Sequence, residues 1–277
     1  MSDAALLYEN RDGVAWLTMN RPDAMNSISL DMIALYEQYM EQILTDDAIK
    51  VVVITGAGRG FSAGGDLKSE ADPLGAGDDP DFDMGNFGPY KELAHYFFND
   101  LRHQVLQRAF KKFEDLQPIT IAAINGLAIA AGMERAADCD IRIASTEAYF
   151  GLFEVKRGIL PGYAMHNLAR VLPFGEAMYL MLTGDTMSVA EAHRLGFVHE
   201  VVEPHQLMVR AVEIAEMIGG NAPLAVQATK AVAQYWRRLG LEESLRLGAW
   251  VSHYALESED AKEGPLAFAE KRTPVWK

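Results

Sequence analysis

The chain of 277 residues has almost no cysteine and fewer basic than acidic side chains. Its one cysteine, Cys139, excludes a disulfide within the chain, so we expect a reducing compartment, the cytoplasm. With 25 Lys and Arg against 39 Asp and Glu, the formal net charge is −14. An acidic chain is a poor candidate for binding nucleic acid phosphates. No run approaches the ~20 consecutive apolar residues of a membrane span, and the first residues do not resemble a signal peptide.

Clusters of metal ligands are also missing. The seven histidines are scattered through the chain, and no pair has the spacing of a metal-binding motif. We therefore expect no metal site and treat the histidines as surface or helix residues. His166 alone is a candidate for facing a bound ligand, because it follows an unusual loop.

The N-terminal half alternates strand and helix patterns. Residues 6–20 predict a hairpin, because Asp12 and Gly13 lie between two hydrophobic runs. Apolar residues at helical spacing predict a helix from Ser29 to Thr45, with Ser29 as its N-cap. The continuous β-branched run at 51–54 predicts a buried strand, and a glycine-rich loop follows at 55–65.

The middle of the chain repeats this arrangement after an acidic interruption. Residues 69–90 are rich in Asp, Gly and Pro and predict a surface excursion that can act as a lid, followed by a helix at 91–115. A strand at 120–124, a loop of small residues at 125–132 and a helix to Ala137 come next. Two further strands are predicted at 140–144 and 148–150.

No strand pattern remains beyond Glu203, where four helical segments follow. They are predicted at 205–219, 223–238, 241–256 and 258–270. The sequence thus predicts an α/β body at 1–203 and a helical C-terminal region at 204–277. Trp236 and Trp250 are expected in its core or in a subunit interface.

The two loops of small residues are candidates for binding a ligand through the backbone. Glycine and alanine allow close approach, and the first amides of a following helix lack partners inside that helix. Such amides can stabilise an oxyanion. A tight turn or a phosphate-binding turn remains an alternative for either loop. Their similarity suggests that they form facing halves of one site.

Glu134 and Glu154 are the candidate acid and base. Glu134 begins a helix of small residues, and Glu154 lies among apolar residues. Taken alone, each can also be an ordinary glutamate, at a helix N-terminus or on the surface. In an apolar cleft, however, two carboxyls can divide proton donation and acceptance between them.

Several ordered motifs resemble the enoyl-CoA hydratase/isomerase (crotonase) family over almost the whole chain. In the first half they are Arg21-Pro22 with Asn26, the run from Phe61 to Leu67, and the run from Asn125 to Asp140. In the second half they are the run from Phe150 to Glu154, Pro161-Gly162, the run from Leu182 to Val198, and the run from Phe268 to Trp276.

The resemblance implies a crotonase-like spiral of ββα units whose C-terminal helices assemble trimers, often paired into hexamers. It implies a CoA thioester as substrate and no metal or redox cofactor. The thioester oxygen would accept the backbone amides of Gly65 and Ala131, with Glu134 and Glu154 as catalytic acids and bases. The CoA moiety would bind at these positions: Ala24, Ala63, Asp66, Leu67 and Lys271.

The resemblance favours hydration of a 2-enoyl-CoA to a 3-hydroxyacyl-CoA, because both hydratase glutamates are present. Isomerisation, carnitinyl-CoA-type dehydration and C–C cleavage remain alternatives on the same oxyanion hole, and a non-catalytic RNA-binding relative is a rival of another class. The segment 161–170 departs from the family pattern, because it lacks the usual glycine pair. That departure and the 69–90 insertion leave the acyl preference open.

Overall fold

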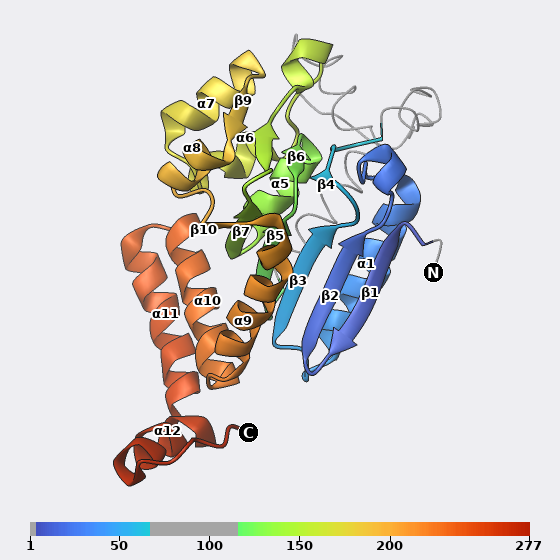
Figure 1. The fold of residues 1–277 in the computed structure, drawn as a ribbon. Helices are drawn as coiled ribbons and strands as arrows, with labels where there is room; N and C mark the ends of the chain where they lie inside the picture. The colour runs from blue at the N-terminus through green and yellow to red at the C-terminus, as the bar shows by residue number, and fades with distance from the viewer. Residues whose placement is uncertain (1–3, 67–115) are drawn as a thin grey trace, which may run out of the picture.

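The computed structural model describes residues 4–66 and 116–277, and its first element is a β-hairpin (Figure 1). Strands β1 (Leu6–Arg11) and β2 (Val14–Met19) are antiparallel. Asp12 and Gly13 between them have φ angles of 52° and 80°. A two-residue hairpin turn requires positive φ at both positions, which Asp and Gly tolerate well. The predicted hairpin is confirmed.

A six-stranded sheet forms the centre of the molecule. Its order is β1-β2-β3-β5-β7-β10, and every pair after the hairpin is parallel. The strands added to the hairpin are β3 (Val51–Gly56), β5 (Ile119–Ile124), β7 (Ile141–Ser145) and β10 (Glu200–Val202). The strands predicted at 51–54, 120–124 and 140–144 are therefore confirmed. Their uninterrupted apolar runs suit a sheet that is covered on both faces.

Helices cover both faces of this sheet (Figure 1). Helix α1 (Leu30–Thr45) packs on one face, and the Ser29 side chain caps it by accepting a hydrogen bond from the Met32 N–H. Helix α9 (Leu207–Gly219) packs on the other face. Successive β3 residues point to opposite faces of the sheet, so Val52 packs on the side of α1 and Val53 on the side of α9.

A second, smaller sheet has the order β4-β6-β8-β9. Its strands are β4 (Gly60–Ser62), β6 (Leu127–Ile129), β8 (Tyr149–Gly151) and β9 (Thr186–Ser188). β4 and β6 lie inside 55–65 and 125–132, which the sequence predicted as loops throughout. That prediction was wrong for these two stretches, because the glycines and other small residues around them are typical of loops.

The C-terminal helices confirm the four predicted segments. After α9 come α10 (Pro223–Arg238), α11 (Leu241–Leu256) and α12 (Glu259–Glu270). The Lys230 ammonium of α10 lies 2.6 Å from Asp140 and 2.8 Å from the Pro118 carbonyl, which fastens this helix beside the large sheet. The predicted α/β class with a helical C-terminal region is thus confirmed, whereas the division after residue 203 stays a prediction.

Large apolar side chains remain exposed on the C-terminal helices. Trp236, Trp250 and Phe268 are 69, 73 and 86% exposed in the single chain. Trp236 and Trp250 therefore do not belong to a core of the single chain. Within the described ranges, no helix combines the length and the hydropathy that a membrane crossing demands. The lid predicted at 69–90 and the helix predicted at 91–115 lie outside the described residues.

Candidate active site

Three parallel strands of the small sheet end at one edge, and the candidate site residues follow directly after them. β4 pairs with β6, and β6 pairs with β8. Gly65 lies three residues after β4, Ala131 two after β6 and Glu154 three after β8. The Ala130 N–H donates to the Gly151 carbonyl at 2.9 Å, which keeps the ends of β6 and β8 together. The sheet thereby gathers residues that are distant in sequence.

The first two loops touch each other at Gly64. A Cβ built on Gly64 would lie 2.6 Å from the Ala130 Cβ and 3.2 Å from the Ala131 backbone nitrogen. Gly64 also has a φ of 88°, which favours glycine. The next residue, Gly65, therefore lies beside the first residue of α5 (Ala131–Asp138). The structure brings the two predicted amide donors into one region.

Neither of these two amides donates a hydrogen bond within the described part of the chain. Gly65 forms a single parallel bridge with Ile28. In this bridge the Ile28 N–H donates to the Gly64 carbonyl and the Asp66 N–H donates to the Ile28 carbonyl. The N–H of Gly65 itself therefore points away from Ile28. The Ala131 N–H is the first of α5 and has no partner inside the helix. Two adjacent N–H groups are thus available for an oxygen atom of a ligand.

Glu134 lies one helical turn after Ala131 and is only 3% exposed. Its Oε1 accepts a hydrogen bond from the Ala164 N–H at 2.7 Å. Burial raises the pKa of Glu134 from 4.5 to about 7, while the Ala164 N–H lowers it and the nearby Glu154 raises it. This carboxyl can therefore exchange a proton near neutral pH.

Glu154 begins a short 3-10 helix, Glu154–Arg157, and is 7% exposed. Its Oε2 has no hydrogen-bond partner among the described residues. Burial raises the pKa of Glu154 to about 7, against the lowering effects of its own backbone N–H and of Arg157. A buried carboxyl oxygen without a partner is costly unless it holds a proton or binds a water molecule or ligand.

These two carboxyls make the folded chain less stable at alkaline pH. Their pKa values are higher in the folded chain than the ordinary 4.5, so their protonated forms favour folding. That stability is present below pH 4.5 and is lost as the pH rises through 7. We expect each group to remove up to ~3 kcal/mol from the free energy of unfolding between pH 5 and 8.5.

Urea unfolding at both pH values measures this effect. Glu154→Gln has no ionisable group at that position, so its free energy of unfolding should fall less between pH 5 and 8.5. An equal fall in the variant and the wild type would contradict the assignment.

The predicted CoA-binding residues are brought together in part. The Ala63 N–H donates to the Met25 carbonyl at 2.9 Å, which places Ala63 beside the turn that contains Ala24. Asp66 follows on the same strip of backbone, and its carboxylate lies 2.8 Å from Arg21. Ala24, Ala63 and Asp66 therefore form a strip beside the Gly65 amide.

The other two predicted CoA contacts are not at this strip. Leu67 lies outside the described residues. Lys271 is an exposed residue at the end of α12, at the opposite end of the molecule from α5 and β4 (Figure 1). The single chain thus does not bring Lys271 to the site.

Sequence reasoning missed the segment that supports Glu134. Helix α6 (Ala164–Asn167) provides the Ala164 N–H, and Asn167 is buried against Asp138 of α5. The sequence showed that 161–170 is unusual, because it lacks the usual glycine pair. It did not indicate that a backbone N–H of this segment contacts Glu134. His166, the one histidine considered, is exposed on α6.

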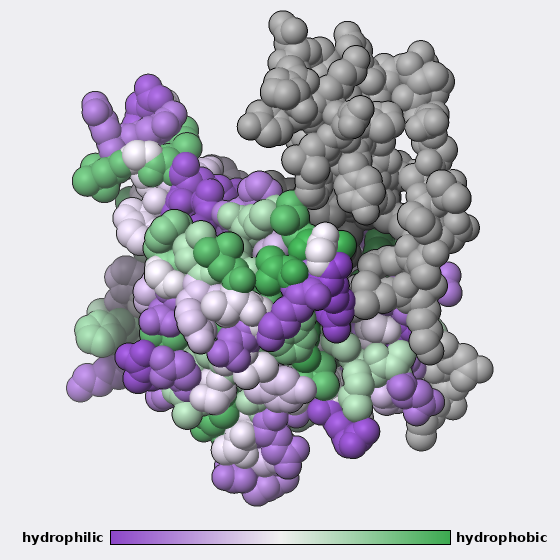
Figure 2. All heavy atoms as spheres, turned by 90° about the horizontal axis from the view of Figure 1, so that it is seen from above, coloured by the Kyte–Doolittle hydropathy of each residue, from purple (hydrophilic) through white to green (hydrophobic). Residues whose placement is uncertain are grey.

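Some large apolar side chains are exposed on the surface near α6, among polar ones. Figure 2 shows hydrophobic side chains near the middle of the upper face. Among the residues after Glu154, Ile159, Leu160 and Met165 are 39, 42 and 42% exposed. The Ile159 N–H donates to the Glu154 carbonyl, so the backbone that carries Ile159 and Leu160 lies next to Glu154. An apolar group bound beside Glu154 has apolar neighbours available.

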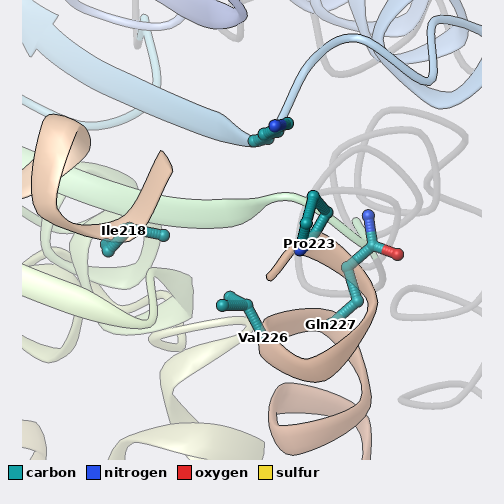
Figure 3. A pocket seen from close by; sticks show the side chains of 5 residues that line it. Ile218, Pro223, Val226 and Gln227 are labelled. Atoms are coloured by element: carbon teal, nitrogen blue, oxygen red, sulfur yellow. The ribbon is translucent and has the colours of Figure 1, made fainter. Parts of the chain in front are cut away.

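A pocket at the opposite end of β3 is a different feature (Figure 3). It is lined by Lys50 before β3, Ile218 of α9, and Pro223, Val226 and Gln227 of α10. The loop containing Gly64 follows the other end of β3, about 20 Å away for a six-residue strand. This pocket is therefore not part of the candidate site.

Known proteins are similar to this chain over nearly its full length. The sequence profile of the family described as "Enoyl-CoA hydratase/isomerase" matches residues 9–82 and 88–277. An (E)-benzylidenesuccinyl-CoA hydratase from Thauera aromatica is 38% identical over 266 residues, 95% of each chain. A carnitinyl-CoA dehydratase from Salmonella arizonae is 37% identical over 283 residues, covering 100% of this chain and 99% of its own. A crystal structure of an enoyl-CoA hydratase from Bacillus anthracis has a TM-score of 0.85 at 31% identity and 99% coverage of both chains.

Proposed function

This chain belongs to the enoyl-CoA hydratase/isomerase family, and on that premise we propose that it adds water reversibly across the 2,3-double bond of a 2-enoyl-CoA. The product is a 3-hydroxyacyl-CoA. The hydroxyl of water bonds to C3, and a proton is added at C2. Relatives named as hydratases and dehydratases support this hydro-lyase chemistry, since the two reactions differ only in direction.

The two free amides are proposed to polarise the substrate. In this proposal the thioester carbonyl oxygen accepts the N–H groups of Gly65 and Ala131, which are adjacent and have no partner among residues 4–66 and 116–277. Negative charge grows on that oxygen as the nucleophile attacks C3. Backbone donors that are already oriented stabilise the charge without having to rearrange.

Glu134 and Glu154 are proposed to hold the water and move its protons. A pKa of about 7 for both means that one carboxyl of the pair can be ionised while the other is protonated at neutral pH. The ionised group takes a proton from the attacking water, and the protonated group delivers one to C2. The observation that carries this proposal is that two buried acids follow the same strand ends as two amides that donate to no group in the described part of the chain.

The substrate is proposed to have an apolar acyl group. Ile159, Leu160 and Met165 follow Glu154 and expose apolar side chains. The CoA moiety is proposed to bind along the strip of Ala24, Ala63 and Asp66, with Leu67 as a further contact. No metal or redox cofactor takes part in the proposed reaction.

Turnover of enoyl-CoA esters tests the proposed reaction. The purified protein is given short, medium, long and aryl-substituted 2-enoyl-CoA esters, and the products are identified by mass and by NMR. We expect a gain of 18 mass units, loss of the conjugated double bond, and incorporation of one deuterium at C2 in heavy water. An unchanged mass with a shifted double bond would indicate isomerisation, and release of a shorter acyl-CoA would indicate C–C cleavage.

Dehydration of a 3-hydroxyacyl-CoA of the carnitinyl type is a second candidate. It is favoured by the 37% identity to a carnitinyl-CoA dehydratase, and the same residues would run the reaction in reverse. A non-catalytic RNA-binding role is opposed by the net charge of −14. We further propose self-association as a trimer or hexamer, because Trp236, Trp250 and Phe268 are exposed in the single chain.

A further inference from the structure

Helices α5 and α6 are joined by two buried hydrogen bonds one helical turn apart. Glu134 Oε1 accepts from the Ala164 N–H at 2.7 Å, and Asp138 Oδ1 accepts from Asn167 Nδ2 at 2.5 Å. Residues four apart share one face of an α-helix, so α6 lies along the face of α5 that carries Glu134. The two ends of α6 are thereby attached to the same face of α5.

The second attachment is part of a buried ionic group. Arg135 is 1% exposed, its guanidinium lies 3.8 Å from the Asp138 carboxylate, and it stacks over the Tyr36 ring of α1 at 5.0 Å. Burying an ion pair requires desolvation of both charges, and apolar replacement of the whole pair is often neutral or stabilising. Stability of the fold alone therefore does not account for a charged Asp138 in this core.

We infer that Asp138 and Asn167 are positioning residues for Glu134, because they hold α6 where its Ala164 N–H points at the Glu134 carboxyl. Both residues are buried, at 7 and 5% exposed, and are inferred to act through α6 rather than on the substrate. The inference deepens the proposed function and rests on it for its kinetic consequences. The titration of Glu134 itself is a consequence that does not depend on the substrate.

The groups around Glu134 determine whether its pKa rises or falls when the contacts of α6 are weakened. Glu154 from the neighbouring 3-10 helix raises the pKa of Glu134, and Arg135 on its own helix and the backbone N–H groups of Ala164 and Tyr163 lower it. Burial is the largest cause of the raised pKa. In a variant that shifts α6 but keeps Glu134 buried, only the lowering effect of the Ala164 N–H is lost. The pKa of Glu134 then rises, and so does the pH at which its ionised form becomes available.

Asn167→Leu tests this inference, because leucine has a similar size and no amide donor. We expect the limb of the pH profile of kcat/KM that reports Glu134, acidic if it is the base and alkaline if it is the acid, to move up by about 0.5–1 pH unit, which corresponds to one hydrogen bond. Infrared or 13C NMR titration of the carboxyls, with Glu134→Gln to assign the signal, should show the same upward movement. A double replacement, Arg135→Met with Asp138→Leu, removes both charges together and should give a larger upward movement, because the lowering effect of Arg135 is lost as well, without a large loss of stability.

Lys230→Met is the matched control. It breaks another ion pair, with the exposed Asp140, and Lys230 is bonded to Asp140 and the Pro118 carbonyl rather than to α6 or Glu134. It should lower the urea midpoint and leave both the pH profile and the Glu134 titration unchanged.

The outcomes separate this inference from the proposed function. If Asn167→Leu behaves like Lys230→Met, losing stability without moving the Glu134 titration, the positioning role is overturned. If Glu134→Gln retains wild-type turnover, the proposed catalytic role fails, but the carboxyl titration still decides whether Asn167 acts on Glu134.

Discussion

Glu134→Gln is expected to lower kcat for enoyl-CoA hydration by roughly 10²–10⁴-fold, the usual contribution of a positioned acid or base. Glutamine keeps the size of the side chain, and its carbonyl oxygen can still accept the 2.7 Å hydrogen bond from the Ala164 N–H. What it loses is the ability to exchange a proton near pH 7. We therefore expect a large fall in kcat with a small change in KM and an intact fold.

Glu154→Gln should produce a loss of similar size for the same reason. Stopped-flow or steady-state loss of the enoyl absorbance measures kcat for both variants. Glu147→Gln is the matched control, because Glu147 is an exposed glutamate in the turn between β7 and β8. Turnover within twofold of the wild type in either active-site variant would refute the role of that residue, provided that the control is also normal.

Gly64→Ala is expected to lower both the stability and the activity of the chain. The new Cβ would lie 2.6 Å from the Ala130 Cβ and 3.0 Å from the Ile129 carbonyl oxygen, at a φ of 88° that alanine disfavours. Strain and overpacking together should reduce the free energy of unfolding by about 2–4 kcal/mol. The loops must also move apart, so Gly65 and Ala131 would no longer converge on one oxygen atom, and kcat/KM should fall by about 10²-fold.

Two further variants make this test specific. Gly196 has a φ of 78° and nothing within 4 Å of a built Cβ, so Gly196→Ala introduces the same backbone strain away from the loops. It should lose about 1 kcal/mol of stability and no activity. In the double variant Gly64→Ala with Ala130→Gly, the 2.6 Å contact is absent, and part of both losses should be recovered. A double variant no better than Gly64→Ala would show that the Ala130 contact is not the cause.

The longer elements were predictable from the sequence because their signals are local. The Asp12-Gly13 turn, the Ser29 cap and the apolar run at 51–54 each follow from the preferences of a few adjacent residues. The three-residue strands β4 and β6 were not predictable. Their hydrogen bonds come from strands far away in the sequence, and the glycines and other small residues around them are typical of loops.

The site was predictable to a different degree. The resemblance to a family indicated Gly65, Ala131, Glu134 and Glu154, and these remain proposals for the reaction. The supporting contacts of Glu134 could not be predicted, because Ala164 donates through its backbone and any residue except proline could do so. Asn167 and Asp138 are 29 residues apart, and their hydrogen bond depends on how α6 docks on α5.

Two kinds of proposed catalytic group follow the parallel strands β4, β6 and β8, namely backbone amides and carboxyl side chains. Main-chain groups at the ends of β4 and β6 are oriented by strand pairing, so side-chain substitutions away from the Gly64–Ala130 contact leave them in place. The groups proposed to transfer protons are side chains, and each can be replaced by a single substitution. Under the proposed function, an evolving lineage can thus acquire a new reaction at positions 134 and 154 while it keeps the two backbone amides that activate the thioester.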